Sequence, residues 1–172
     1  MGGKERPMKT EKIPVLINLL ALARYNQMPD YPIQVMTRGE LSFPGGPGFL
    51  LEYRELQDDE ETGKVNSADV SLSVEGNRVT MLRSGECFNT MVFDQKHRFE
   101  GTYHTPFGDM DMAVDTRDVS CHMSPERGNI HLRYLLHFNG SYASTNELHL
   151  EYYSEESLRK GKEAAENENP AQ

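Results

Sequence analysis

From residue 31 onward the chain alternates between apolar and polar positions, in short runs that are separated by turn residues. The clearest run is ADVSLSVE, in which Val70, Leu72 and Val74 point one way and the residues between them point the other way. A period of two residues is typical of a half-buried β-strand. Because such runs recur along the chain with turn residues between them, the pattern predicts about ten short antiparallel strands.

Almost every connection between these runs is short, which favours an up-and-down meander over a Greek key. A long meander with one apolar face removes its exposed edges by closing on itself. We therefore expect an all-β protein, built as a single closed antiparallel up-and-down barrel over residues 13–153. A flexible lead (1–12) precedes the barrel, and a charged tail (154–172) follows it as a short helical turn that gives way to disorder.

Two hairpins fix the register of the expected barrel. A two-residue turn at Gly76-Asn77 brings these positions together: Val74 with Val79, Leu72 with Met81, and Val70 with Arg83. A three-residue loop at 139–141 sets up the last hairpin with these pairs: Ile130 with Leu150, Leu132 with Leu148, and, on the outside, Arg133 with Glu147. The outer charge pair would contribute only a few tenths of a kcal/mol.

Composition limits the classes of function. The chain has 172 residues and a formal net charge of −9, with 37% hydrophobic and 26% charged residues. These values fit one folded domain and argue against binding to nucleic acid or to an anionic membrane, which needs clustered Lys and Arg. The two cysteines, Cys87 and Cys121, fit free thiols in a reducing cytoplasm. The alternative is export, if residues 1–23 act as a signal peptide.

Several segments resemble the YwiB-like family of small bacterial β-barrel proteins, which is classed with the calycins. They are VTMLRSGE, GTYHTPFGDMDMAVDT, GNIHLRYLLHFNG and NELHLEYY, and the resemblance extends over about residues 13–153. It implies a calycin-like, lipocalin-like barrel without an assigned activity, and so it carries over no catalytic residue. It also implies that KIPVLINLLALA is the first barrel strand, although its Leu and Ala favour a helix.

Arg83 is the main candidate for a functional residue, because the register points its side chain into the barrel. A buried charge needs a partner. Either Arg83 receives the carboxylate or phosphate of a ligand, or it closes the barrel end by bonding to backbone carbonyls and a nearby acid, which is the reading we favour. The inward side chains around it form a tentative ligand site or a packed core: Tyr53, Tyr103, Tyr134, Met81 and Met112.

Other clusters have simpler interpretations. His131 lies opposite His149 in the expected register, but no third ligand is evident, so we expect solvated histidines and no metal site. Asp109, Asp111 and Asp115 form a charged outer face. The sequence contains no Ser–His–Asp arrangement, phosphate-binding loop or HExxH motif, so we assign no catalytic residue and no cofactor and do not expect an enzyme.

The expected function is therefore the non-enzymatic binding of a small, partly apolar molecule inside the barrel. The alternative is a filled-core interaction module that acts through its outer surface or through a homodimer face.

Overall fold

The computed structural model describes residues 11–25, 30–58, 62–63 and 65–168, which form one antiparallel sheet and a C-terminal helix. The strands and the helix are, in chain order, β1 (Ile13–Tyr25), β2 (Tyr31–Ser42), β3 (Phe49–Asp58), β4 (Val65–Glu75), β5 (Arg78–Ser84), β6 (Asn89–Phe93), β7 (Phe99–Thr105), β8 (Gly108–Met123), β9 (Arg127–Phe138), β10 (Ser141–Ser154) and α1 (Glu155–Glu168). The fold is thus the all-β up-and-down arrangement that the alternation predicted.

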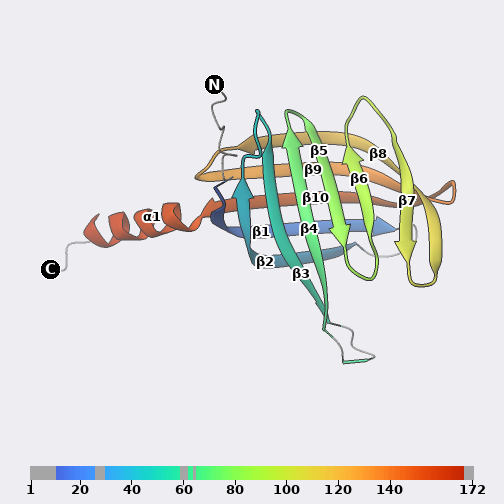
Figure 1. The fold of residues 1–172 in the computed structure, drawn as a ribbon, viewed down its shortest axis with the longest axis horizontal. Helices are drawn as coiled ribbons and strands as arrows, with labels where there is room; N and C mark the ends of the chain where they lie inside the picture. Colours follow the sequence, from blue (N-terminus) through green and yellow to red (C-terminus); the bar gives the residue numbers. More distant parts are fainter. Residues whose placement is uncertain (1–10, 26–29, 59–61, 64, 169–172) are drawn as a thin grey trace, which may run out of the picture.

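The sheet curls into a nearly closed barrel. Its strand order is β6-β5-β4-β3-β2-β1-β10-β9-β8-β7, so β6 and β7 are the two ends of the sheet. Within the described residues, these ends are joined by an isolated bridge, in which Phe88 and His104 exchange two backbone hydrogen bonds of 3.1 Å. In Figure 1, β3 to β7 cross at a steep angle in front of β8, β9, β10 and β1. The interface between these two layers holds the core.

The first hairpin has the predicted register. Val74 pairs with Val79, and Val70 pairs with Arg83, across a turn in which Gly76 has a φ of 58°. Glycine adopts this left-handed conformation without a steric penalty, so the two-residue turn is well accommodated. The prediction that Arg83 lies on the same face of the sheet as buried Val70 is confirmed.

The last hairpin has the predicted pairs but a different turn. Leu132 pairs with Leu148, whereas the loop contains two residues rather than three, because Ser141 already pairs with Phe138. Asn139 and Gly140 have φ values of 50° and 81°, as a tight hairpin turn requires. A bulge between Tyr142 and Ser144 takes up the extra residue and restores the predicted register.

The segment 13–23 is a strand, as the family resemblance implied. β1 pairs with β10 on one side and with β2 on the other, so it lies in the middle of the sheet. Its inward side chains join a core whose largest fully buried members include Tyr152, Phe93, Ile17, Leu41, Leu51 and Leu72. Central pairing and burial outweigh the intrinsic helix preference of its Leu and Ala residues.

The charged tail begins with a longer helix than the expected short turn, since residues 155–168 form α1. Ser154 Oγ accepts a hydrogen bond of 3.0 Å from the backbone N–H of Ser157, and Glu155 and Glu156 lie in the first turn. A serine cap and acidic residues at the N-terminus both stabilise a helix.

The predicted N-terminal lead cannot be compared with the structure in full, because residues 1–10 lie outside the described residues. In the described part of the chain, no helix has the length and the apolar character that crossing a membrane requires.

Candidate functional site

An ion pair between Arg83 and Glu55 lies on the inner side of the barrel wall. Arg83 comes from β5 and Glu55 from β3, two residues after inward-facing Tyr53. Arg83 Nη2 lies 2.9 Å from Oε1 and 2.8 Å from Oε2 of Glu55. The two side chains are only 30% and 19% exposed. The barrel therefore neutralises its own inward arginine with an acid from β3.

The Arg83–Glu55 pair leaves part of the guanidinium unused. Arg83 Nε is buried and has no hydrogen-bond partner among the described residues. Asn89, the β6 residue paired with Arg83, is 9% exposed, and its Oδ1 is also buried without a partner. Its Nδ2 contacts Met112 Sδ at 4.0 Å. Neighbouring inward residues thus keep one unsatisfied donor and one unsatisfied acceptor, and each such group costs about 1–3 kcal/mol.

The three predicted tyrosines, Tyr53, Tyr103 and Tyr134, lie near this pair. Burial raises the pKa of Tyr134 to about 12, and burial together with the charge of Glu55 raises the pKa of Tyr53 further. Burial and a hydrogen bond with Cys87 raise the pKa of Tyr103. In all three cases the charge of Arg83 acts in the opposite direction, which places the hydroxyls close to the guanidinium. They remain neutral hydroxyl groups near pH 7.

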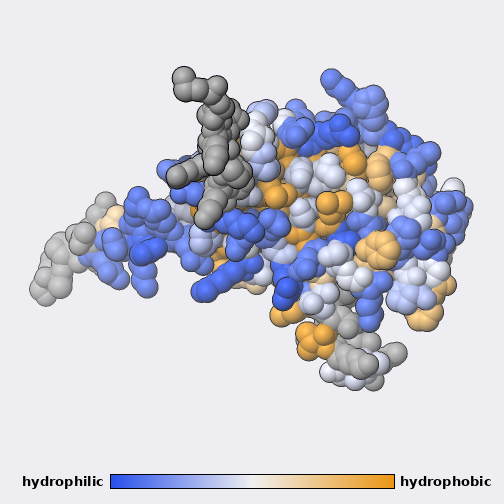
Figure 2. Space-filling view, viewed as in Figure 1, coloured by the Kyte–Doolittle hydropathy of each residue, from blue (hydrophilic) through white to orange (hydrophobic). Residues whose placement is uncertain are grey.

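A pocket of about 1090 Å³ borders this cluster and is lined by residues of β2 to β7. Outward side chains such as Leu82 and Phe88 line it, and so do the inward residues Asn89 and Phe99. The pocket includes residues of both faces of the sheet, and its lining extends to β6 and β7, the two ends of the sheet that one isolated bridge joins. We call this opening the β6–β7 seam. Figure 2 shows apolar surface between hydrophilic side chains on this face of the barrel.

The structure separates the six predicted ligand residues into two groups. Arg83 and Tyr53 line the pocket, whereas the other four are absent from its lining: Tyr103, Tyr134, Met81 and Met112. Met81 and Met112 are core residues, with exposed fractions of 6% and 3%.

Glu55 and Asn89 were not identified from the sequence. Each continues the inward phase of its strand, Glu55 after Tyr53 and Asn89 before Met91, so alternation could have found both.

Two other predicted features lie on the outer face. Arg133 is opposite Glu147, as expected, but its ion pair of 2.7 Å is with Asp118 of β8. Asp109 pairs with His104 Nδ1 at 2.9 Å.

Both cysteines are free thiols, as expected. Burial raises the pKa of the Cys121 thiol to about 11.

Comparisons with known proteins agree with this architecture. The model of a family described as "Domain of unknown function (DUF1934)" matches residues 23–150. The crystal structure of the YwiB protein from Bacillus subtilis superimposes with a TM-score of 0.72 and 18% sequence identity, over 84% of this chain and 94% of that one. A search of curated proteins gave no match. At this level of identity the likeness to YwiB shows the fold alone.

Proposed function

Because the chain belongs to the DUF1934 family, whose description assigns no activity, we propose a function from the site itself: non-enzymatic binding of a small, uncharged, partly apolar molecule at the β6–β7 seam. The proposal rests on one observation. Arg83 Nε and Asn89 Oδ1 are buried and unsatisfied, on paired residues that border a pocket of about 1090 Å³. Because both atoms are buried, the side chains of Arg83 and Asn89 must turn toward the pocket before a ligand can reach them. A ligand group that then accepts from the first atom and donates to the second would remove both penalties.

The charges around the pocket favour an uncharged ligand. Glu55 already balances the charge of Arg83, at 2.8 Å. At the rim, Arg54 pairs with Asp69 at 3.1 Å and Arg38 lies 3.7 Å from Glu155. A ligand anion would have to displace a carboxylate from its partner, whereas a hydroxyl or carboxamide needs only the unused edge of the guanidinium.

Apolar surface next to the polar atoms fits the remainder of such a ligand. Leu82 and Phe88 line the pocket and are 48% and 50% exposed. Phe88 stacks on His104, with 4.3 Å between the ring centroids and an angle of 17° between the planes. Phe99 lines the same space from β7. Ligand sites commonly combine an apolar wall with a few polar groups that fix orientation.

Native mass spectrometry of freshly purified protein tests the proposal. We expect the wild type to retain a small organic adduct, and Asn89→Leu, which removes the buried acceptor at similar volume, to lose it. Ser73→Ala is the control, because Ser73 lies on β4 outside the pocket lining. If the wild type carries no adduct from cell extract, or if Asn89→Leu retains the adduct, the seam is not a ligand site. Ordered water would then satisfy the two atoms.

A further inference from the structure

A second cluster lies on the outer face of β9 and β10, on other strands than those that line the seam pocket. His131 of β9 and His149 of β10 are direct register partners, and Glu147 precedes His149 by two residues. Residues two apart on a strand share a face, and opposite residues on paired strands lie about 4.5–5.5 Å apart at Cβ. The register therefore brings two imidazoles and one carboxylate together on one surface.

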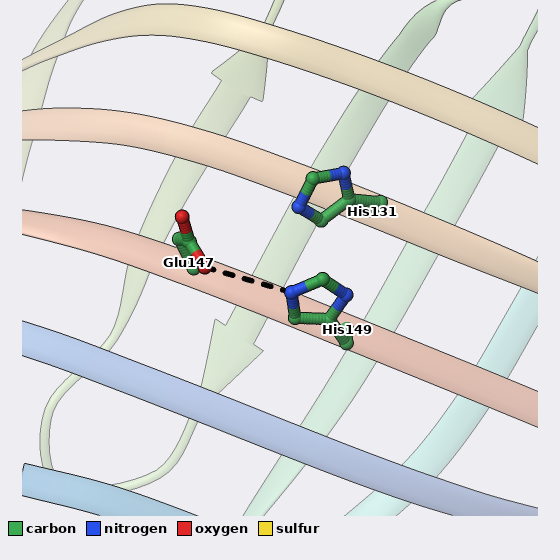
Figure 3. Close-up of side chains that lie close together, drawn as sticks. All are labelled: His131, Glu147 and His149. Carbon is green, nitrogen blue, oxygen red and sulfur yellow. Dashed lines mark ion pairs between the residues drawn. The ribbon is translucent and has the colours of Figure 1, made fainter.

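We propose that His131, Glu147 and His149 form a binding site for a divalent transition-metal ion of the Zn²⁺ class. One ligand atom from each residue can be chosen so that all three lie within 4.8 Å of one another. His149 Nε2 lies 3.6 Å from Glu147 Oε2. Figure 3 shows a ring nitrogen of each histidine on the side that Glu147 occupies.

The buried nitrogen of His131 is a second and independent observation. His131 Nε2 is buried and has no hydrogen-bond partner among the described residues. A neutral imidazole nitrogen in this position is costly unless it meets a donor or a metal ion. A metal ion between the two rings and the carboxylate would satisfy it.

The neighbouring charges do not oppose a cation. Arg133 is the nearest basic residue in the register, directly opposite Glu147, but its guanidinium is 2.7 Å from Asp118 on the other side. On the adjacent strands, the residues directly opposite the two histidines are neutral: Leu20 of β1 pairs with His149, and Ser120 of β8 pairs with His131. Glu147 therefore remains available to a cation at this surface.

The ligand types select the metal. Imidazole nitrogens suit Zn²⁺, Cu²⁺, Ni²⁺ and Fe²⁺, whereas Ca²⁺ and Mg²⁺ prefer sites built from oxygen ligands. Two histidines and one carboxylate provide three ligands and leave a coordination position open to solvent. Such an open site binds an ion with a water molecule in the fourth position.

Binding requires the rings to turn. The imidazoles are stacked, with centroids 4.1 Å apart and an angle of 19° between the planes, so their lone pairs run nearly parallel. Ligands at about 2.0–2.2 Å from one tetrahedral ion lie roughly 3.3 Å apart, which a rotation of the rings can provide. The ring torsion of histidine is soft, and the His149 side chain is 47% exposed, so this rotation has room.

Isothermal titration of the full-length protein with ZnCl₂ tests the site. We expect one high-affinity ion per chain. His131→Ala and His149→Ala should each weaken binding by more than about 100-fold, since even changes behind a ligand cost about 10–100-fold. His104→Ala is the matched control, because His104 also pairs with a carboxylate, Asp109, but belongs to no three-ligand group among the described residues.

Cobalt spectroscopy provides a readout that does not depend on stability. The wild type with Co²⁺ should show the intense visible absorption of a four-coordinate ion, and Glu147→Gln should reduce it. His149→Gln replaces an exposed side chain on the barrel surface, so it tests ligation if His131→Ala does not fold. Zn²⁺ affinity that is unchanged in the His149 variants, or equal loss in His104→Ala, would overturn the assignment. Equal affinity for Mg²⁺ would also refute it.

Discussion

The Arg83–Glu55 pair leads to the most direct prediction about stability. Replacing Arg83 by Met keeps much of the apolar stem and removes the charge. The carboxylate of Glu55, whose side chain is only 19% exposed in the wild type, then has no partner. Breaking a fully buried pair costs about 3–5 kcal/mol, whereas an exposed pair contributes about 0–1 kcal/mol. The exposed fractions of 30% and 19% lie between these limits, so we expect Arg83→Met to lose about 2–3 kcal/mol.

Urea unfolding followed by far-ultraviolet circular dichroism measures this loss, since the chain has no tryptophan. With a slope of about 2 kcal/mol per molar urea, the midpoint should fall by about 1–1.5 M. The double variant Arg83→Met/Glu55→Leu removes both charges and should recover most of the stability.

The Arg54–Asp69 pair is the matched control, because it joins β3 to β4 on the outer face at 3.1 Å with both side chains about two-thirds exposed. Arg54→Met should cost less than about 1 kcal/mol. If Arg83→Met costs no more than Arg54→Met, or if the double variant is less stable than Arg83→Met alone, the inward ion pair does not support the barrel.

Two further predictions concern other parts of the barrel. A Cβ added at Gly39 would lie 2.5 Å from the backbone oxygen of Glu52, so Gly39→Ala should destabilise the barrel by about 1–3 kcal/mol in urea unfolding. Gly161→Ala is the control, because a Cβ there meets nothing within 4 Å, and an equal loss of stability in this variant would contradict the reasoning. Because burial raises the pKa of Cys121 from 9.0 to about 11, its thiol stays protonated at pH 8. In a Cys87→Ser variant, Cys121 should therefore react with iodoacetamide about 100-fold more slowly than an ordinary thiol, and the rate should rise up to about pH 11. A reaction rate that levels off near pH 9 would refute the burial of this thiol.

The sequence was sufficient to predict the sheet because one rule governs most of it. Alternation with a period of two, together with the length of the Gly76-Asn77 turn, determined which residues of β4 and β5 are paired and which of them face inward. The same alternation contained the inward phase of Glu55. Its contact with Arg83 was not predictable in this way, because it crosses β4 and depends on the registers of two hairpins at once.

The features that the sequence did not predict are those in which the rule is interrupted. The bulge after Tyr142 shortens the last loop from three residues to two without moving any predicted pair, so the pattern of apolar residues contains no trace of it. The seam likewise depends on how far β6 and β7 separate, which is a property of the curvature of the sheet. The two unsatisfied atoms of Arg83 and Asn89 could be recognised only after both strands were placed.

The two interpretations of Arg83 are compatible because they use different edges of its guanidinium. Nη2 holds Glu55 and supports the barrel, while Nε is buried beside the seam without a partner. A stability measurement on Arg83→Met alone therefore cannot separate them, since the variant loses both edges. The double variant Arg83→Met/Glu55→Leu can, because it restores a neutral interior and still lacks the Nε donor. A double variant that is stable but has lost the ligand adduct would show that the Arg83–Glu55 pair serves ligand binding as well as stability, and one that is stable and retains the adduct would limit the pair to supporting the barrel.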